Sequence, residues 1–381
     1  MTSRLEELIA ELCPNGVEYK KIGDIADVKT GKSNGNEAEE DGLYPFFVRS
    51  ENIKRKNDWE YDEEAIIIPG EGGIGDIYHY IKGKYALHQR VYRVHFEEPI
   101  VNTRFAYYYF KSNFKRFIIR KAVSATVTSI RKPMIEDFEI PVPPLEVQAE
   151  IVQILDTFTE LTAELAAELT ARKKQYEYYR DTLLTFDDNN PLHSLIQRYC
   201  PNGVEYKKIG EIAFISTGSK LSDIQESPSL YEYINAGTTN SGYSLDWNCD
   251  GDVVTTPSRG QGGIGYVGYQ KNKFWLGPLC YKIAGNADFV LNKYLYYCLS
   301  NNSYAILSLK KDGGVPAINK SDLEELILPV PPLEVQRQIV QILDRFDALC
   351  NDLTQGLPAE IEARRKQYEY YRDQLLTFKR A

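Results

Sequence analysis

Two long amphipathic stretches dominate the hydrophobic pattern of the chain. Apolar side chains recur every three or four positions in residues 145–186, and again after residue 333. This period is that of an α-helix with one apolar face. At 1.5 Å per residue the first stretch would span roughly 60 Å, so its stripe requires a partner along its length. The stripes consist of Ile151, Leu155, Phe158, Leu161, Leu165 and Leu169, and of Ile339, Leu343, Phe346, Leu349, Leu353 and Leu357.

Each stretch offers the apolar face that the other needs. Because the stripes match and the chain returns between them, we predict that the two helices pack antiparallel as a coiled coil. The globular region that precedes each helix would then lie at one end of the helix pair, and a rough two-fold axis would relate the two regions. A short helix over residues 5–12 is expected to meet the end of the C-terminal helix and to close the arrangement.

The two stretches differ by four residues. Phe158 lies 17 residues before Gln175, whereas Phe346 lies 21 residues before Gln367. The extra residues fall beside Gln-Gly-Leu-Pro-Ala (355–359). Glycine weakens a helix and proline interrupts its hydrogen bonds, so we predict a break here, with the proline at the start of a renewed helix.

Three strings of residues occur twice at nearly constant spacing, which indicates an internal duplication. We name them the domain-start string Cys-Pro-Asn-Gly-Val-Glu-Tyr-Lys (13–20, 200–207), the proline string Pro-Val-Pro-Pro-Leu-Glu-Val-Gln (141–148, 329–336) and the tyrosine string Lys-Gln-Tyr-Glu-Tyr-Tyr-Arg-Asp (174–181, 366–373). We therefore divide the chain into a short N-terminal helix (1–13), a first globular domain (14–140), a central helix (141–190), a second globular domain (191–328) and a C-terminal helix (329–381).

The regions between the strings predict mixed α/β domains. Short apolar runs at 65–68, 91–94 and 253–256 are typical of strands, and aromatic-rich segments at 103–120 and 289–299 of helices. The two regions share little identity beyond short islands, so connectors were kept while the globular surfaces diverged. The predicted fold class is α+β, with two globular domains separated by the coiled coil. The islands are Gly-Gly-Ile-Gly (72–75, 262–265) and the pair 127–130 and 315–318.

The local distribution of charge along the chain is more informative than its net charge. The chain of 381 residues has a net charge of −9 and a pI near 5.3, which argues weakly against a nucleic-acid partner. Residues 103–135, however, hold eight basic side chains and no acidic one, and residues 253–287 hold four and none. No apolar run reaches membrane-spanning length, and the six cysteines form no Cys-x-x-Cys pair. We expect a cytoplasmic protein with reduced thiols.

The three strings together resemble those of the specificity subunit of type I DNA restriction–modification systems. The resemblance covers essentially the whole chain. It implies that each globular domain is a target recognition domain that reads one half of a bipartite duplex DNA site, and that the long helices set the spacing and dock methyltransferase subunits. In the family the number of Thr-Ala-Glu-Leu-like units is associated with the gap between half-sites, and two such units stand at 162–169.

The resemblance also implies which chemistry lies elsewhere. The family's specificity subunit has no catalytic residues, so no enzyme activity, cofactor or metal is expected in this chain. S-adenosylmethionine and ATP are expected on partner subunits. The expected partners are duplex DNA, two methyltransferase subunits and restriction subunits.

Candidate contact residues follow from the chemistry of base recognition. Arg or Lys can read guanine and Gln or Asn adenine, whereas phosphate contacts need only positive charge. The tyrosine strings are the candidates for docking a methyltransferase: Tyr176, Tyr178, Tyr179, Tyr368, Tyr370 and Tyr371. The candidates for DNA contact are Arg49, Lys54, Arg55, Lys56, Glu71, Gln89, Arg90, Arg104, Lys121, Arg131, Lys132, Arg259, Gln261, Lys271, Lys273, Lys310 and Lys311.

Other functions compete with DNA reading. The Gly-x-Gly-Gly-x-Gly strings (70–75, 260–265) resemble phosphate-binding loops, but neither continues into Gly-Lys-Ser/Thr, which favours tight turns. The four histidines lack partners at metal-ligand spacing, and no methyltransferase catalytic string occurs. A coiled-coil scaffold that joins proteins without DNA is the main alternative. It would leave the acid-free basic segments unexplained.

Overall fold

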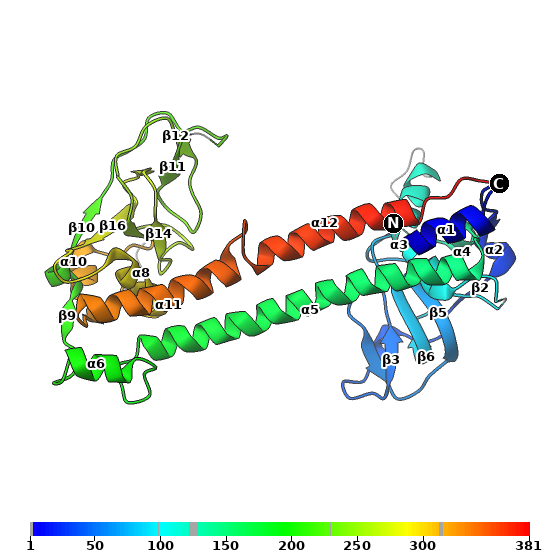
Figure 1. Cartoon of the computed structure of the whole chain (residues 1–381), viewed down its shortest axis with the longest axis horizontal. Helices are drawn as coiled ribbons and strands as arrows, with labels where there is room; N and C mark the ends of the chain where they lie inside the picture. The colour runs from blue at the N-terminus through cyan, green and yellow to red at the C-terminus, as the bar shows by residue number, and fades with distance from the viewer. Residues whose placement is uncertain (1–2, 98, 122–128, 229, 312–314) are drawn as a thin grey trace. The chain divides into compact units, whose positions relative to one another are not determined.

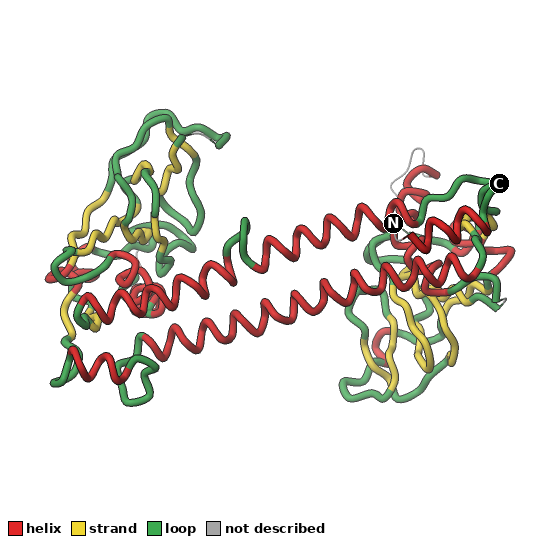
Figure 2. Tube along the Cα trace, viewed as in Figure 1, coloured by secondary structure: helices red, strands yellow, loops and turns green. Residues whose placement is uncertain are grey.

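The computed structural model describes the chain except for residues 1–2, 98, 122–128, 229 and 312–314 (Figures 1 and 2). The chain forms two compact units. Unit 1 comprises Met1–Ala166 and Glu360–Ala381, and unit 2 comprises Ala167–Ala359. Each unit contains a mixed α/β domain and parts of the long helices, which confirms the predicted fold class. The finer domain boundaries stay a prediction.

Unit 1 is built on a six-stranded sheet with the order β2-β7-β5-β6-β3-β4. All neighbours are antiparallel except β3 and β6. The predicted strands at 65–68 and 91–94 are confirmed as β5 and β7. A separate antiparallel pair, β1 and β8, lies where the domain starts and ends. The strands are β1 (Tyr19–Lys21), β2 (Asp27–Thr30), β3 (Tyr44–Phe47), β4 (Lys54–Lys56), β5 (Tyr61–Pro69), β6 (His79–Leu87), β7 (Val91–His95) and β8 (Glu139–Pro141).

Unit 2 repeats this strand order in two smaller sheets, β10-β16-β13-β14 and β12-β11-β15. The single strand β6 of unit 1 corresponds to β14 and β15, which are separated by Lys-Asn-Lys (271–273). Pairing is otherwise alike, including the parallel pair β11–β15. The strands are β9 (Tyr206–Lys208), β10 (Ala213–Thr217), β11 (Tyr231–Ile234), β12 (Tyr243–Ser244), β13 (Val253–Pro257), β14 (Gly268–Gln270), β15 (Phe274–Leu276), β16 (Cys280–Gly285) and β17 (Ile327–Pro329).

One aromatic-rich helix packs on the sheet of each unit. Phe110, Phe114 and Ile118 of α3 join the core of unit 1, and Tyr294 and Leu295 of α8 join that of unit 2. The helices are α1 (Ser3–Leu12), α2 (Ile22–Ile25), the 3-10 helix η1 (Gly35–Glu37), α3 (Thr103–Lys121), α4 (Lys132–Glu136), α5 (Leu145–Leu183), α6 (His193–Tyr199), α7 (Ile209–Ile212), α8 (Asn292–Asn301), α9 (Ser303–Ser308), α10 (Lys320–Glu324), α11 (Leu333–Asn351) and α12 (Leu357–Leu375).

The glutamine of the proline string explains why that string is repeated. Gln148 is fully buried. Its carboxamide accepts a hydrogen bond from the Asn102 N–H at 2.7 Å and donates to the Ile100 and Pro143 carbonyl oxygens at 2.9 and 2.6 Å. The side chain thus ties the start of α5 to the loop before α3. We call this arrangement the glutamine clasp.

Unit 2 contains the same clasp around the buried Gln336. Its carboxamide accepts from the Leu291 N–H at 2.9 Å and donates to the Phe289 and Pro331 carbonyl oxygens at 2.8 and 2.7 Å. Because residues 289 and 291 are engaged in this way, α8 begins at Asn292, three residues later than the aromatic segment predicts.

The long helices pair antiparallel within each unit. In unit 1 the Phe158 ring of α5 stacks on Tyr371 of α12, with ring centroids 5.6 Å apart. In unit 2 the Tyr179 ring of α5 stacks on Phe346 of α11 at 5.2 Å. The predicted stripe is buried only in part. Ile151, Leu155, Ile339 and Leu343 are fully buried, whereas Leu161 and Leu353 are 42% and 79% exposed.

The expected break in the second helix is confirmed between α11 and α12. Asp352 accepts hydrogen bonds from Thr354 and Gln355, which turns the chain away from the helix. A side chain at Gly356 would meet the Ala348 carbonyl oxygen at 2.6 Å, so only glycine fits there. Pro358 is the second residue of the renewed helix, where its missing N–H has no helical acceptor. The prediction that the second stripe continues through Leu353 was wrong for this reason.

Local contacts fix the C-terminal end of α5 and join the first helix of the chain to the last. The Asn190 side-chain amide donates to the Thr182, Leu183 and Thr185 carbonyl oxygens, so α5 ends at Leu183 rather than near 186. In unit 1, Leu5 of α1 shares a core with Leu375 and Leu376 at the end of α12. The predicted meeting of the 5–12 helix with the C-terminal helix is therefore confirmed.

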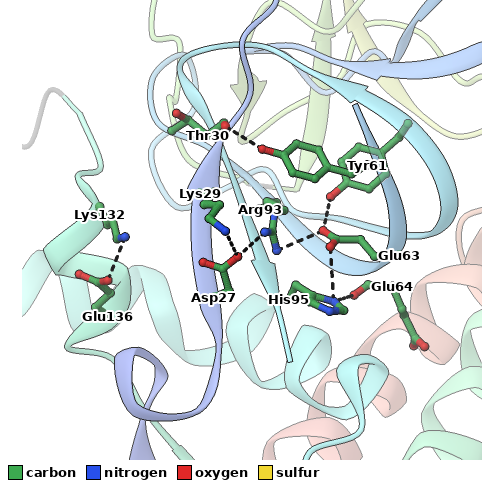
Figure 3. A network of polar contacts seen from close by, with 11 residues as sticks. Asp27, Lys29, Thr30, Tyr61, Glu63, Glu64, Arg93, His95, Lys132 and Glu136 are labelled. Carbon is green, nitrogen blue, oxygen red and sulfur yellow. Dashed lines mark hydrogen bonds and ion pairs between the residues drawn. The ribbon is translucent and has the colours of Figure 1, made fainter. Parts of the chain in front are cut away.

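The sheet of unit 1 contains an ionic network that sequence analysis did not predict (Figure 3). The guanidinium of Arg93, which is 5% exposed, pairs with Asp27 of the neighbouring strand and lies 3.2 Å from the Glu63 carboxylate. Tyr85 donates to the same Glu63 oxygen at 2.8 Å, and the Arg93 guanidinium lies 4.8 Å from the centroid of the Tyr61 ring. The network joins β2, β5, β6 and β7.

Candidate nucleic-acid interface

The glycine loop of unit 1 carries a carboxylate that holds two arginines. Glu71 lies in the turn between β5 and β6. Its Oε2 atom lies 2.9 Å from Arg49 Nη1, and both its oxygens lie 3.0 Å from Arg90 Nη1. These hydrogen bonds, first from Arg90 and then from Arg49, lower the pKa of the Glu71 carboxyl. The Arg side chains are about half exposed, so the cluster presents donors and acceptors to solvent.

Backbone contacts fix this loop. The Gly70 N–H donates to the Arg90 carbonyl oxygen at 3.0 Å, and the Ile130 N–H donates to Gly70 at 2.8 Å. His88 is buried, and its Nδ1 accepts the Arg90 N–H at 3.0 Å. Burial, with Arg49 and Arg90 nearby, lowers the pKa of His88. The imidazole therefore acts as a neutral acceptor that orients the Arg90 backbone.

The other candidates on the sheet side of unit 1 are partly engaged. Gln89 donates to the Asn34 side chain at 2.8 Å. The Arg55 guanidinium donates to the Gly42 and Leu43 carbonyl oxygens. Lys54 and Lys56 reach Gly35 at 3.4 Å and Glu37 at 2.7 Å, respectively. These cations hold the loop between β2 and β3; Lys54 and Arg55 are exposed, whereas the Lys56 side chain is only 14% exposed.

The basic segment 103–135 gains two acidic partners from other elements and one from the end of its own helix α4. Arg104 pairs with Asp156 at 2.9 Å, Lys115 with Asp76, and Lys132 with Glu136 at 3.4 Å. Arg131 is exposed just before α4. Lys121 ends α3, and its side chain lies outside the described part of the chain.

Two arginines of this segment line a surface hollow. Arg116 and Arg120 line a hollow of about 540 Å³ with Lys21 and Arg380. Within the described ranges neither Arg116 nor Arg120 has an ion pair. Sequence analysis counted both in the basic segment but did not select them. Their helical spacing of four residues was the available signal.

The glycine loop of unit 2 presents its side chains differently. Arg259 and Gln261 are exposed. In the part of the chain that the structure describes, the Arg259 guanidinium and the Gln261 carboxamide have no hydrogen bond or ion pair. The backbone is nevertheless fixed as in unit 1, since the Ser258 N–H donates to the Leu279 carbonyl oxygen and the Ile318 N–H donates to the Ser258 carbonyl oxygen, each at 2.9 Å. The loop thus resembles that of unit 1 in its backbone but not in its exposed groups.

The candidate lysines of unit 2 lie around this loop and in the Lys-Asn-Lys connection between β14 and β15. Lys273 Nζ lies 3.9 Å from the centroid of the Trp247 ring, and Lys311 pairs with Asp322 at 2.8 Å. Lys271 lines a hollow of about 500 Å³ together with acidic residues of α11. Lys310 is exposed. The structure brings together Arg49, Glu71 and Arg90, while the contact role of every candidate stays a prediction.

The tyrosine strings build the same surface twice. The second tyrosine of each, Tyr178 or Tyr370, is 64% or 60% exposed. Each lies edge-on to the next tyrosine, with ring centroids 5.6 and 5.5 Å apart. The other four candidates are half-buried against their own unit: Tyr176, Tyr179, Tyr368 and Tyr371.

A metal, redox or membrane site depends on what the side chains of the described residues offer. Among the described residues, no group of three or more His, Cys, Asp or Glu side chains could bind a metal ion. All six cysteines are buried free thiols. Of the helices described, none is long and apolar enough to cross a membrane.

Comparisons with known proteins identify related sequences and one related fold. A family model for the type I restriction modification DNA specificity domain matches residues 14–172 and 201–363. A Haemophilus influenzae protein named as a type I restriction enzyme specificity subunit is 31% identical over 385 residues, 95% of this chain and 96% of that protein. The EcoR124I/EcoR124II specificity subunit of Escherichia coli is 36% identical over 258 residues, 63% of each chain. A crystal structure of a type I restriction–modification S subunit from M. genitalium shares the fold, with a TM-score of 0.70 at 19% identity over 95% of this chain and 97% of that one.

Proposed function

Because the chain belongs to the family of type I restriction–modification DNA specificity subunits, we propose that its two domains read separate halves of one bipartite duplex DNA sequence. The observation that carries this proposal is the contrast between the two glycine loops. Their backbones are fixed in similar ways, while Glu71 holds two arginines and, among the residues that the structure describes, Arg259 and Gln261 make no such side-chain bonds. Equal scaffolds with unequal exposed groups suit the reading of two different sequences.

The exposed groups match the hydrogen-bonding edges of bases in the major groove. An arginine can donate two hydrogen bonds to guanine, a glutamine can pair with adenine, and a carboxylate can accept from cytosine. Arg49, Glu71 and Arg90 would read one half-site, and Arg259 and Gln261 the other. Arg116, Arg120 and Lys271 would contact phosphates, which position the protein without reading sequence.

The chain itself would carry out no chemistry. Two methyltransferase subunits would dock at Tyr178 and Tyr370, because the tyrosine string presents one exposed ring in each repeat. Restriction subunits would complete the complex. S-adenosylmethionine and ATP would bind to those partner subunits.

Footprinting on duplex DNA, with the methyltransferase partner present, tests this function. We expect two protected segments separated by an unread gap, and an affinity that falls steeply with salt because phosphate contacts release counterions. Binding that ignored both sequence and salt would leave only a protein scaffold and would overturn the proposal.

A further inference from the structure

We propose that a repeated cluster of one cation, three tyrosines and one aspartate fixes the angle of each recognition domain on its long helix, and thereby sets which gap between half-sites is accepted. We call this cluster the cation latch. The inference rests on the proposed function, because it concerns how the two reading domains are spaced. It assigns a positioning role to residues that contact one another rather than DNA.

The latch of unit 1 is centred on Arg104 of α3. Its Nε and Nη2 atoms lie 3.0 and 2.9 Å from Oδ1 of Asp156 on α5. The guanidinium also lies 4.7 Å from the centroid of Tyr80, 5.4 Å from that of Tyr107 and 5.2 Å from that of Tyr108. The Tyr108 hydroxyl donates to the same Asp156 oxygen.

The latch of unit 2 is centred on Lys293 of α8. Its Nζ lies 3.5 Å from Oδ1 of Asp344 on α11. It also lies 4.3 Å from the ring centroid of Tyr269, 5.0 Å from that of Tyr296 and 5.3 Å from that of Tyr297. The Tyr297 hydroxyl donates to that Asp344 oxygen at 2.5 Å.

Every member of one latch corresponds to a member of the other. The spacing between copies is 188 residues for the aspartate and 189 for the cation and each tyrosine. The domains around the latch share little identity, yet all three rings and both charges are kept. The cation changes from Arg to Lys, so what is kept is a positive charge among aromatic faces, which attract cations.

The position of the latch explains why a charge is useful there. One tyrosine comes from the sheet, the cation and two tyrosines come from the domain helix, and the carboxylate comes from the long helix. Apolar packing alone is non-directional and tolerates small rotations. A carboxylate that accepts from both the cation and a tyrosine hydroxyl restricts the domain to one orientation, because hydrogen bonds require a defined angle.

The latch also explains the surroundings of Arg104. Sequence analysis placed Arg104 among the DNA contacts, whereas the structure directs its guanidinium to Asp156. The two roles predict different defects. Loss of a phosphate contact lowers affinity and the salt dependence of binding for every duplex, whereas loss of the latch changes the preference among gaps.

The experiment compares Asp156→Asn with the intact chain, each bound to its methyltransferase partner. Affinity is measured for duplexes that carry the mapped half-sites with the natural gap, one base pair fewer and one base pair more. We expect the preference for the natural gap to fall about tenfold, which is about 1.4 kcal/mol, with half-site preferences unchanged. Asp344→Asn should act in the same way from unit 2.

Three further variants separate positioning from simple stability. Arg104→Lys introduces the residue that unit 2 uses and should keep the gap preference, whereas Arg104→Met should lose it. Glu160→Gln removes an exposed carboxylate one turn further along α5 and should leave the preference intact. An equal loss of affinity for all three gaps, or an unchanged gap preference in Asp156→Asn, would overturn the latch. If the intact chain showed no preference for a bipartite site, the proposed function itself would fail.

Discussion

The two units share a frame but differ at the centre of their sheets. In unit 1, Arg93 forms ion pairs with Asp27 and Glu63. The strand registers place Phe214 opposite Ala284 in unit 2, where unit 1 has Asp27 opposite His95. The position of Arg93 is occupied by Lys282, which has no ion pair within the described ranges. The strand order and both glutamine clasps are nevertheless the same.

This difference shows which parts of the repeat were free to change. Backbone pairing and the clasps define how each domain attaches to its helix, so they persist. The ionic network is not part of that attachment, and in unit 2 the residue at the position of Asp27 is Phe214, which is 72% exposed. The glycine loops keep their glycines and isoleucine in both units, and they differ in one side chain, Glu71 in unit 1 and Gln261 in unit 2.

Arg93→Met should have the largest effect on the difference in stability between the two units. We expect the free energy of unfolding of unit 1 to fall by about 3 kcal/mol, because the buried guanidinium between Asp27 and Glu63 is lost, although Asp27 keeps Lys29 and Glu63 keeps Tyr85 as partners. The matched change Lys282→Met should cost unit 2 less than about 1 kcal/mol. Hydrogen exchange of amides in β5 and β7, compared with β13 and β16, measures the two effects separately. Equal losses would contradict the contrast.

The same network predicts a difference in acid sensitivity. Burial raises the pKa of Asp27, but the hydrogen bond from Lys29 and the charge of Arg93 outweigh it, so the net pKa is lowered from 3.8. A lowered pKa stabilises the fold above that value, and the contribution disappears as pH falls through the pKa of the folded state. Exchange protection of β2 and β7 should therefore drop below about pH 4 more steeply than that of β10 and β16. Parallel profiles would argue against the network.

Loss of the glutamine clasp should destabilise the two units equally. Gln148→Leu removes the partner of the buried Pro143 carbonyl oxygen and of the partly buried Asn102 N–H and Ile100 carbonyl oxygen, which should cost about 2–3 kcal/mol. Gln336→Leu should cost unit 2 a similar amount. Gln153→Leu, at an exposed site on the same helix, is the control. Denaturant unfolding followed by exchange in α3 and α8 gives the two values, and a neutral Gln336→Leu would show that the clasps are not equivalent.

Substitutions in the glycine loop of one unit should change base preference in only one of the two half-sites. Arg259→Ala or Gln261→Ala should relax base preference in one half of the site by about 1–3 kcal/mol, the usual value of a bidentate base contact. Glu71→Ala should relax the other half by releasing Arg49 and Arg90. Selection from a randomised duplex library measures both. Equal relaxation in both halves would refute the assignment of one loop to one half-site.

The smallest change in affinity is expected from lengthening α5. One more Thr-Ala-Glu-Leu after Leu169 adds roughly 6 Å of helix and should widen the gap while leaving both half-sites as they are. The new gap should be bound about as tightly as the old one was. Mapping of methylated sites tests this, and an unchanged gap would count against the long helix as a ruler.

Sequence patterns predicted the elements that depend on local rules. Periodicity predicted α5 and α11, an aromatic-rich segment predicted α3, and Gly356 with Pro358 predicted the break before α12. Contacts between distant residues were not predictable in this way. Nothing local marks Gln148 as buried, and Asp156 and Asp76 neutralise part of a segment that is free of acids in sequence. The latch needed a comparison of both repeats in space.

Methylation mapping of a host genome that carries this chain with its methyltransferase partner tests the central claim most directly. The two domains share one fold but carry different side chains on their glycine loops. We therefore predict a methylated motif of two different short segments, separated by a fixed number of unspecified bases. A single uninterrupted motif, two identical half-sites, or methylation that does not depend on this chain would contradict the account.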